Sequence, residues 1–217
     1  IQKLSAPPTI VGRLLEVPAL PPRRLPRPAE LAHLHALIIE RRGRTTSYQT
    51  SHITLLEGMG GIGKSFLAAA FAQACPTRTA FPDGIIWISV GQQPNQGHLY
   101  QRIGVALGDN PANYPTDEGT CRVRVQNTLR GKRCLLILDD LWDLPTGRAF
   151  QDLVVGTDTD LLITTRNLKI REALGAAACR VDLLDQVQSI DLLQVLTGRL
   201  DPGYADVAEA LGFAWER

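Results

Sequence analysis

Apolar residues along the chain follow two alternating spacings, and this alternation predicts the class of fold. Short, continuous apolar runs lie at residues 53–56, 85–90, 134–138, 161–165 and 180–183, and such runs are typical of strands buried on both faces. Helical spacing lies between the runs, at residues 64–74, 97–107, 121–129 and 168–174. Strands that alternate with helices predict an α/β fold in which helices cover both faces of a parallel sheet.

The two ends of the chain depart from this alternation. Residues 1–28 are rich in proline, including Pro7-Pro8 and Pro21-Pro22, so we expect an extended arm. Helical spacing begins at residues 29–40, and after residue 184 it returns, with a second short helix expected at 204–211. We therefore expect a proline-rich arm at 1–28, an α/β domain at 29–184, and the beginning of a helical domain, cut short, at 185–217.

A glycine-rich segment follows the first apolar run. Residues 58–65 read Gly-Met-Gly-Gly-Ile-Gly-Lys-Ser, which matches the phosphate-loop pattern G-x-x-x-x-G-K-[ST]. Glycines let backbone N–H groups turn onto a phosphate, and the following helix adds positive potential. We expect Lys64 to reach the β- and γ-phosphates and the Ser65 hydroxyl to bind Mg²⁺. The predicted nucleotide-binding residues here are Gly58, Met59, Gly60, Gly61, Ile62, Gly63, Lys64, Ser65 and Phe66.

An acidic pair ends the third apolar run, where the sequence reads Cys-Leu-Leu-Ile-Leu-Asp-Asp-Leu-Trp over residues 134–142. Ligands of open α/β sheets gather at the carboxyl ends of the strands, and Mg²⁺ prefers oxygen ligands. Asp139 is therefore predicted to hold the magnesium shell beside Ser65. Asp140 is predicted to orient or deprotonate the water that attacks the γ-phosphate; the alternative is that Asp140 simply begins a loop.

An arginine ends the fourth run, which reads Leu-Leu-Ile-Thr-Thr-Arg over residues 161–166. A guanidinium at a strand tip can offer planar, bidentate hydrogen bonds to a phosphate, which lysine cannot. We predict that Arg166 contacts the γ-phosphate and so responds to its presence. The alternative is a surface arginine that starts a loop.

These three motifs, in this order, resemble the successive signatures of the NB-ARC family, the STAND signal-transduction ATPases of apoptosome, plant resistance and bacterial regulator proteins. The segment Phe-Pro-Asp-Gly-Ile-Ile-Trp-Ile-Ser at residues 81–89 also resembles the family, and the likeness covers residues 20–212. It implies a five-stranded sheet in the order 5-1-4-3-2. It further implies a closed ADP state and an open, homo-oligomeric ATP state in the full-length protein, whose remaining C-terminal helical, winged-helix and sensor domains are missing from this chain.

The resemblance also implies an adenine contact from a hydrophobic-Gly-Arg element ahead of the first helix. Two segments are candidates: Ile-Val-Gly-Arg at residues 10–13, and Leu-Pro-Arg at residues 25–27. The first has the usual glycine but lies far from the helix, whereas the second has the right distance with Pro26 in place of glycine. We predict that Arg27, with the Leu25 backbone beside it, contacts adenine, and Arg13 remains the alternative.

Charge and cysteine spacing narrow the class of protein. The net charge is +1, from 23 basic and 22 acidic residues, so no nucleic-acid footprint is evident. The four cysteines form no C-x-x-C pair, which suggests neither zinc nor a disulfide framework. We expect a cytoplasmic protein with no membrane span and, since the sequence begins at Ile1 without a signal peptide, a segment of a longer chain.

Other P-loop proteins match less well. A small-molecule kinase would need an arginine-rich lid segment, and an AAA-type motor usually carries Asn or Thr at the position of Arg166. A GTPase would need an Asn-Lys-x-Asp guanine reader, and a transporter ATPase a Leu-Ser-Gly-Gly signature; neither is present. We therefore predict a slow, Mg²⁺-dependent ATPase that acts as an ATP/ADP switch. Trp87 and Trp142 are assigned to core or helix packing, and the basic run at residues 41–44 to a solvated loop.

Overall fold

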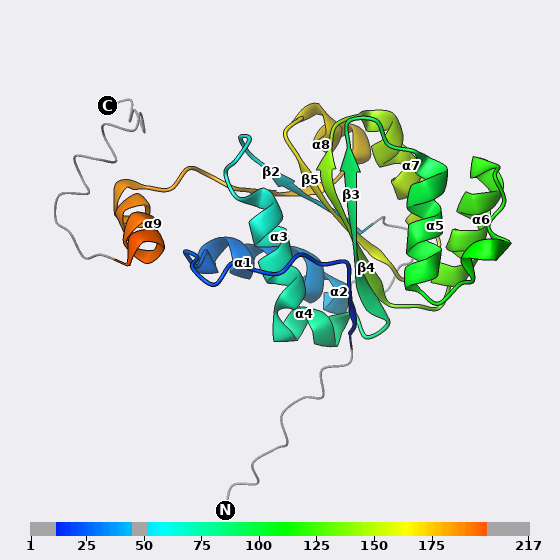
Figure 1. Cartoon of the computed structure of the whole chain (residues 1–217), viewed down its shortest axis with the longest axis horizontal. Coiled ribbons are helices and arrows are strands. Elements are labelled where there is room, and N and C mark those ends of the chain that lie inside the picture. Colours follow the sequence, from blue (N-terminus) through cyan, green and yellow to red (C-terminus); the bar gives the residue numbers. More distant parts are fainter. Residues whose placement is uncertain (1–11, 45–51, 199–217) are drawn as a thin grey trace, which may run out of the picture.

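A parallel sheet forms the centre of the computed structural model, which describes residues 12–44 and 52–198. Within these residues six strands lie in the order β1-β3-β4-β5-β2-β6, of which β2 to β5 are labelled in Figure 1. All neighbouring strands are parallel. The strands are β1 (Leu14–Leu15), β2 (Ile53–Glu57), β3 (Gly84–Gly91), β4 (Cys134–Leu141), β5 (Asp160–Thr165) and β6 (Ala177–Arg180).

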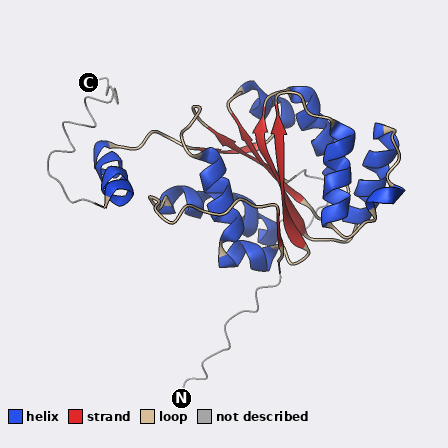
Figure 2. Cartoon of the chain, in the orientation of Figure 1, coloured by secondary structure: helices blue, strands red, loops and turns tan. Residues whose placement is uncertain are grey.

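Helices cover both faces of the sheet (Figure 2). They are α1 (Pro28–His35), a π-helical turn (Ala36–Glu40), α2 (Arg41–Arg44), α3 (Lys64–Gln73), α4 (Cys75–Ala80), α5 (Gln96–Ala106), a 3-10 turn (Pro111–Asn113), α6 (Glu118–Leu129), α7 (Leu144–Val154), α8 (Lys169–Leu174) and α9 (Gln186–Thr197). Helices α1 to α4 lie on one side of the sheet and α5 to α8 on the other (Figure 1). None of the helices in the described part of the chain is both long and apolar enough to cross a membrane.

Alternating strand residues supply two separate cores. In β4, Leu136 and Leu138 join the cluster under α5 to α8, whereas Leu135 and Ile137 join the cluster under α1 and α3. Successive side chains of a strand point to opposite faces, so a strand with helices on both sides must be apolar at every position. This double burial explains the continuous apolar runs of the sequence.

The predicted sheet is confirmed in its class and in the order of its five strands, and corrected in two details. The sheet has a sixth strand, β1, in which Leu14 and Leu15 of the predicted arm pair with Ile85 and Ile86. The last strand begins at Ala177 rather than at residue 180, because residues 177–180 pair with residues 54–57 of β2. Two alanines give little strand signal, so only the pairing reveals this start.

Helices α4 and α7 were not predicted from the sequence, and neither was the short helix α2. Asp143 caps α7 by accepting a hydrogen bond from Thr146 N, but Gly147 in its first turns obscures the helical pattern. A Cβ at residue 147 would lie 3.2 Å from Leu141 Cδ2 and 3.3 Å from Leu174 Cδ1. A side chain at residue 147 would therefore make a tight contact with both leucines, which would have to shift by a few tenths of an ångström. The helix expected at 204–211 lies outside the described residues.

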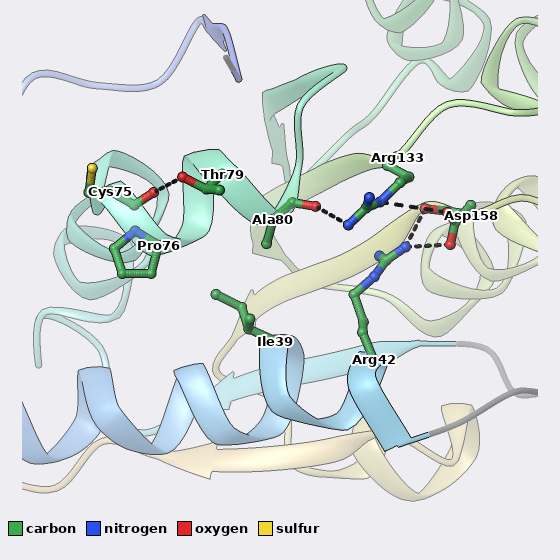
Figure 3. A pocket seen from close by; sticks show the side chains of 8 residues that line it. All are labelled: Ile39, Arg42, Cys75, Pro76, Thr79, Ala80, Arg133 and Asp158. Atoms are coloured by element: carbon green, nitrogen blue, oxygen red, sulfur yellow. Dashed lines mark hydrogen bonds and ion pairs between the residues drawn. The ribbon is translucent and has the colours of Figure 1, made fainter. Parts of the chain in front are cut away.

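The basic run at residues 41–44 is helical, and the assignment of Arg42 to a solvated loop was wrong. Its side chain, 12% exposed, donates to Asp160 Oδ2 at 2.9 Å, forms an ion pair with Asp158, and stacks on Phe81. Figure 3 shows Arg42 and Arg133 converging on Asp158 at one end of a cavity of about 810 Å³, which lies away from the glycine-rich loop. Both arginines are engaged within the fold, so we assign this cluster a structural role.

Asp160→Asn should change how the stability of the fold depends on pH. Burial raises the pKa of Asp160 to about 7, against the lowering effect of Arg42, whereas the unfolded value is about 3.9. The folded state therefore favours the protonated acid, and its stability falls as pH rises from about 4 through 7. Between pH 5 and 8 the wild type should lose about 1–3 kcal/mol relative to the non-titrating variant.

Chemical unfolding of both proteins at pH 5 and pH 8 measures this difference. His52, whose Nδ1 lies 3.7 Å from Asp160 Oδ1, is present in both proteins, so its titration largely cancels. A difference in unfolding free energy that stays constant between the two pH values would show that Asp160 does not titrate in this window.

Candidate functional site

The glycine-rich loop connects β2 to α3, as the sequence predicts. Gly61 and Gly63 have φ angles of 77° and 100°, a left-handed conformation that other residues adopt at a cost of about 1–2 kcal/mol. The ten-residue helix α3 begins at Lys64. Free N–H groups at its first turn and the helix dipole favour an anion at this position. The local backbone is therefore suited to phosphate.

Lys64 lies folded over this loop. Its Nζ donates hydrogen bonds to Gly58 O at 2.8 Å and to Met59 O at 2.7 Å, and the residue is buried. Burial lowers the pKa of Lys64, the nearby Arg166 lowers it further, and Asp140 and Asp139 oppose both effects. The ammonium group thus stands at the mouth of the loop, within a cluster of charges of both signs.

Ser65 and Asp139, 74 positions apart in the chain, meet below the loop. The Ser65 hydroxyl donates to Asp139 Oδ1 at 2.6 Å, and the Thr164 hydroxyl donates to the same oxygen at 2.7 Å. Three oxygen atoms from α3, β4 and β5 therefore lie together, which is a donor set suited to a hard cation. Sequence reasoning missed Thr164, although its place one residue before the end of β5, beside the end of β4, was a usable signal.

Asp140 takes an unusual backbone conformation. Its φ is 58°, a left-handed value that is uncommon for a residue other than glycine. The register of β4 against β5 shifts between Leu138 and Leu141, and the Asp140 N–H donates to the Thr164 hydroxyl at 2.9 Å. Strain of this kind often marks a functional residue. Because of the shift, Asp139 and Asp140 both lie at the edge of the site.

Arg166 completes the cluster. Its Nε lies 3.7 Å from Asp140 Oδ1, and its guanidinium lies over the Trp142 ring, 5.2 Å from the centroid. The Trp142 N–H donates to Asp140 Oδ2 at 3.0 Å. Trp87 is a core residue, as predicted. Trp142 is not: it is 38% exposed, and its ring contacts the predicted site.

The two arginines that are candidates for the adenine contact lie in different places. Arg27 donates to Ile62 O in the loop at 3.3 Å, to Asp182 O at 3.0 Å and to Glu30 Oε1 at 3.0 Å. Arg13 immediately precedes β1, at the edge of the sheet farthest from β6. The folded chain thus brings Arg27, and not Arg13, to the loop.

A cavity of about 620 Å³ lies beside the loop. Its walls come from the N-terminal arm, the loop, the start of α3, and α9 with the segment before it. Sequence reasoning predicted only part of this lining: Leu25, Arg27, the loop and Phe66. The lining residues are Pro21, Arg24, Leu25, Arg27, Met59, Gly60, Gly61, Ile62, Gly63, Phe66, Leu183, Leu184, Ser189, Leu192 and Leu193.

Comparison with known protein families shows to which family this chain belongs. The family model described as the NB-ARC domain matches residues 38–201, which is more than half of the chain. The chain belongs to the NB-ARC family. This NB-ARC domain is therefore a P-loop nucleotide-binding domain, and the resemblance inferred from its three motifs is confirmed.

Curated relatives of this NB-ARC domain come from animals and plants. Apoptotic protease-activating factor 1 of Homo sapiens is 33% identical over 164 residues, which cover 71% of this chain and 13% of the relative. Disease resistance RPP8-like protein 3 of Arabidopsis thaliana is 31% identical over 192 residues, 85% of this chain and 21% of the relative. The chain thus spans no more than about a fifth of either relative.

Solved structures share the fold of this NB-ARC domain. A STAND protein with a tetratricopeptide repeat sensor from Pyrococcus horikoshii superposes with a TM-score of 0.59 at 15% identity, covering 90% of this chain and 29% of that one. Cdc6p of Pyrobaculum aerophilum gives a TM-score of 0.63 at 18% identity, covering 80% of this chain and 50% of that one. At such identities the likeness concerns the fold alone.

Proposed function

We propose that this NB-ARC domain is the ATP/ADP-operated switch of a signal-transduction ATPase, with slow Mg²⁺-dependent hydrolysis of ATP. One observation carries the proposal: Arg166 and Asp140 lie together beside the phosphate loop. Lys64 is close enough to interact with both charges, and the Ser65 hydroxyl donates to the neighbouring Asp139. A cation placed beside the loop can distinguish a nucleoside triphosphate from a diphosphate, because only the triphosphate extends to it.

The oxygen atoms around Asp139 fit a magnesium ion. Ser65 and Asp139 would hold it, and the Thr164 hydroxyl would keep the Asp139 carboxylate in place. When bound, Mg²⁺ neutralises phosphate charge during phosphoryl transfer. Carboxylate, hydroxyl and retained waters are the ligands that Mg²⁺ prefers, and this donor set supports the proposal.

Asp140 and Arg166 are the residues we propose for the chemical step. Asp140 would accept a proton from a water molecule while the water oxygen forms a bond to the γ-phosphorus, and the bond from phosphorus to the ADP oxygen breaks. Arg166 would stabilise the charge on the γ-phosphate oxygens. In the structure Arg166 Nε lies 3.7 Å from Asp140 Oδ1, which leaves the two Nη groups of the guanidinium for the γ-phosphate oxygens.

The arm and α9 would form the nucleoside side of the site. We place the adenine contact at Arg27 and the Leu25 backbone, since both line the cavity that opens beside the loop. The arm also reaches α9, where Arg23 donates to Leu196 O at 2.7 Å. A change in the bound nucleotide can thus alter contacts of the arm, the loop and α9 together.

The same proposal covers the whole protein. We keep the division into an arm at 1–28, a nucleotide-binding domain at 29–184 and the start of a helical domain at 185–217, and we propose homo-oligomerisation in the ATP state of the full-length protein. Membership of the NB-ARC family supports this view. A cytoplasmic location agrees with Cys75, Cys121, Cys134 and Cys179, which are all free thiols.

Isothermal titration calorimetry with ADP and GDP tests the proposed function. We expect ADP to bind about tenfold or more tightly, the equivalent of one good hydrogen bond, because the chain has no guanine reader. Arg27→Ala should lower ADP affinity, while the matched Arg13→Ala should not, because Arg13 lies at the far edge of the sheet. GDP binding as tight as ADP, or equal losses in the two variants, would contradict the assignment.

A further inference from the structure

The guanidinium of Arg166 lies between Gly60, Trp142 and Asp140. A Cβ built on Gly60 would lie 2.9 Å from Arg166 Nη1, and its three nearest atoms all belong to the Arg166 guanidinium. The same guanidinium lies over the Trp142 ring, and its Nε faces Asp140. We call these three neighbours, Gly60, Trp142 and Asp140, the guanidinium slot.

The backbone does not require glycine at position 60. Gly61 and Gly63 have left-handed φ angles, and a Cβ at either position would meet nothing within 4 Å. Gly60 is the reverse case: its φ is not in the left-handed range, but a side chain there would press on Arg166. A side chain at position 60 would therefore have to displace the guanidinium from the position that it occupies here.

Trp142 has no place in the core that would explain it. The residue is 38% exposed, and its N–H is bound to Asp140 Oδ2. An arginine side chain that is 54% exposed would otherwise sample many rotamers, and ordering it costs conformational entropy. An aromatic face under a guanidinium restricts those rotamers and adds a favourable cation–π contact.

We propose that Trp142 is a positioning residue for Arg166: its ring, together with the bare backbone of Gly60, holds the guanidinium in the orientation that reads a γ-phosphate. The inference rests on the proposed function, because it takes Arg166 as the group that distinguishes ATP from ADP. It adds the residues that fix the arginine beforehand, so that less ordering is needed when the triphosphate binds.

The test measures dissociation constants of a non-hydrolysable ATP analogue and of ADP on the whole 217-residue chain. Trp142→Leu removes the aromatic face and should narrow the preference for the ATP analogue over ADP by about two- to fivefold, the value of an exposed cation–π contact. Trp142→Phe keeps a face and should retain most of the preference. In an Arg166→Ala background neither substitution should change the ratio.

Gly60→Ala supplies an independent arm of the same experiment. In a chain that keeps Arg166, the added methyl group should displace the guanidinium and narrow the preference for the ATP analogue over ADP. In the Arg166→Ala background it should leave that preference unchanged. Damage to the loop itself would instead weaken both nucleotides in both backgrounds. The control is Leu168→Ala, an exposed apolar side chain two positions after Arg166, which should leave the ratio as it is.

The outcomes separate the inference from the proposed function. A ratio that Arg166→Ala leaves unchanged means that this arginine does not read the γ-phosphate, and then both are wrong. If Arg166→Ala narrows the preference for the ATP analogue over ADP, but Trp142→Leu and Gly60→Ala do not, only the positioning role of Trp142 and Gly60 is overturned. A Phe variant as impaired as the Leu variant also overturns it, since stacking would then not be the cause.

Discussion

Lys64→Ala should lower the affinity for both ADP and ATP by about tenfold to a hundredfold, because a charge-assisted hydrogen bond to phosphate contributes about 1.5–3 kcal/mol. The structure adds a reason to expect a loss for both nucleotides. Lys64 Nζ donates to Gly58 O and Met59 O, so the ammonium also holds the loop in its curved form. Calorimetry with each nucleotide measures the loss.

Lys132→Ala is the matched control for this prediction. Lys132 lies between α6 and β4, at the amino end of the strand that carries Asp139 at its other end, and its replacement should leave nucleotide affinity unchanged. Thermal unfolding of the two variants separates a lost phosphate contact from a damaged fold. Full nucleotide affinity in Lys64→Ala, with the fold intact, would remove the loop from the binding site.

Arg166→Ala should narrow the preference for ATP over ADP by about 1–3 kcal/mol, the value of one lost hydrogen bond to a charged group, and should change ADP affinity little. The guanidinium lies at the tip of β5, beside Asp140 and close to Gly60. Only contacts made with one nucleotide and not the other can shift a conformational equilibrium. Dissociation constants for ADP and a non-hydrolysable ATP analogue, measured in parallel, give the ratio.

Arg148→Ala serves as the control for the loss of a positive charge. Arg148 is an exposed residue of α7, outside the cavity that opens at the loop, so its replacement should leave the ratio unchanged. If Arg166→Ala and Arg148→Ala have equal effects, the preference for ATP over ADP comes from the general electrostatic field of the domain. If Arg166→Ala leaves the preference unaltered, Arg166 is an ordinary loop arginine.

Local patterns were enough to predict the five principal strands, the phosphate loop and the pair formed by Ser65 and Asp139. A strand buried on both faces is apolar throughout, so the five principal strands were visible in the sequence. The phosphate loop needs glycines where φ is positive, and Gly61 and Gly63 adopt such angles. The pairing of Ser65 with Asp139 followed from the rule that ligands gather at the carboxyl ends of strands.

Several features depend on contacts between distant residues and left little trace in the local pattern. The helix α7 contains Gly147, and Leu141 and Leu174 pack closely against it. Arg42 looked like a solvated residue of a basic run. In the structure it binds Asp158 and Asp160, which lie 116 and 118 positions further along the chain. The contacts of Gly147 and those of Arg42 join residues at no regular spacing, so neither set could be inferred from the sequence.

The sequence by itself determined that this protein is a P-loop domain of parallel α/β class with an oxygen-lined site at its strand ends, because those properties follow from local periodicity and backbone geometry. Only the tertiary structure decided which residues share that site. It brought Arg27, not Arg13, to the loop, and it placed Trp142 and Gly60 against Arg166. Such neighbours are fixed by how strands and helices pack, and packing joins residues that no short-range pattern connects.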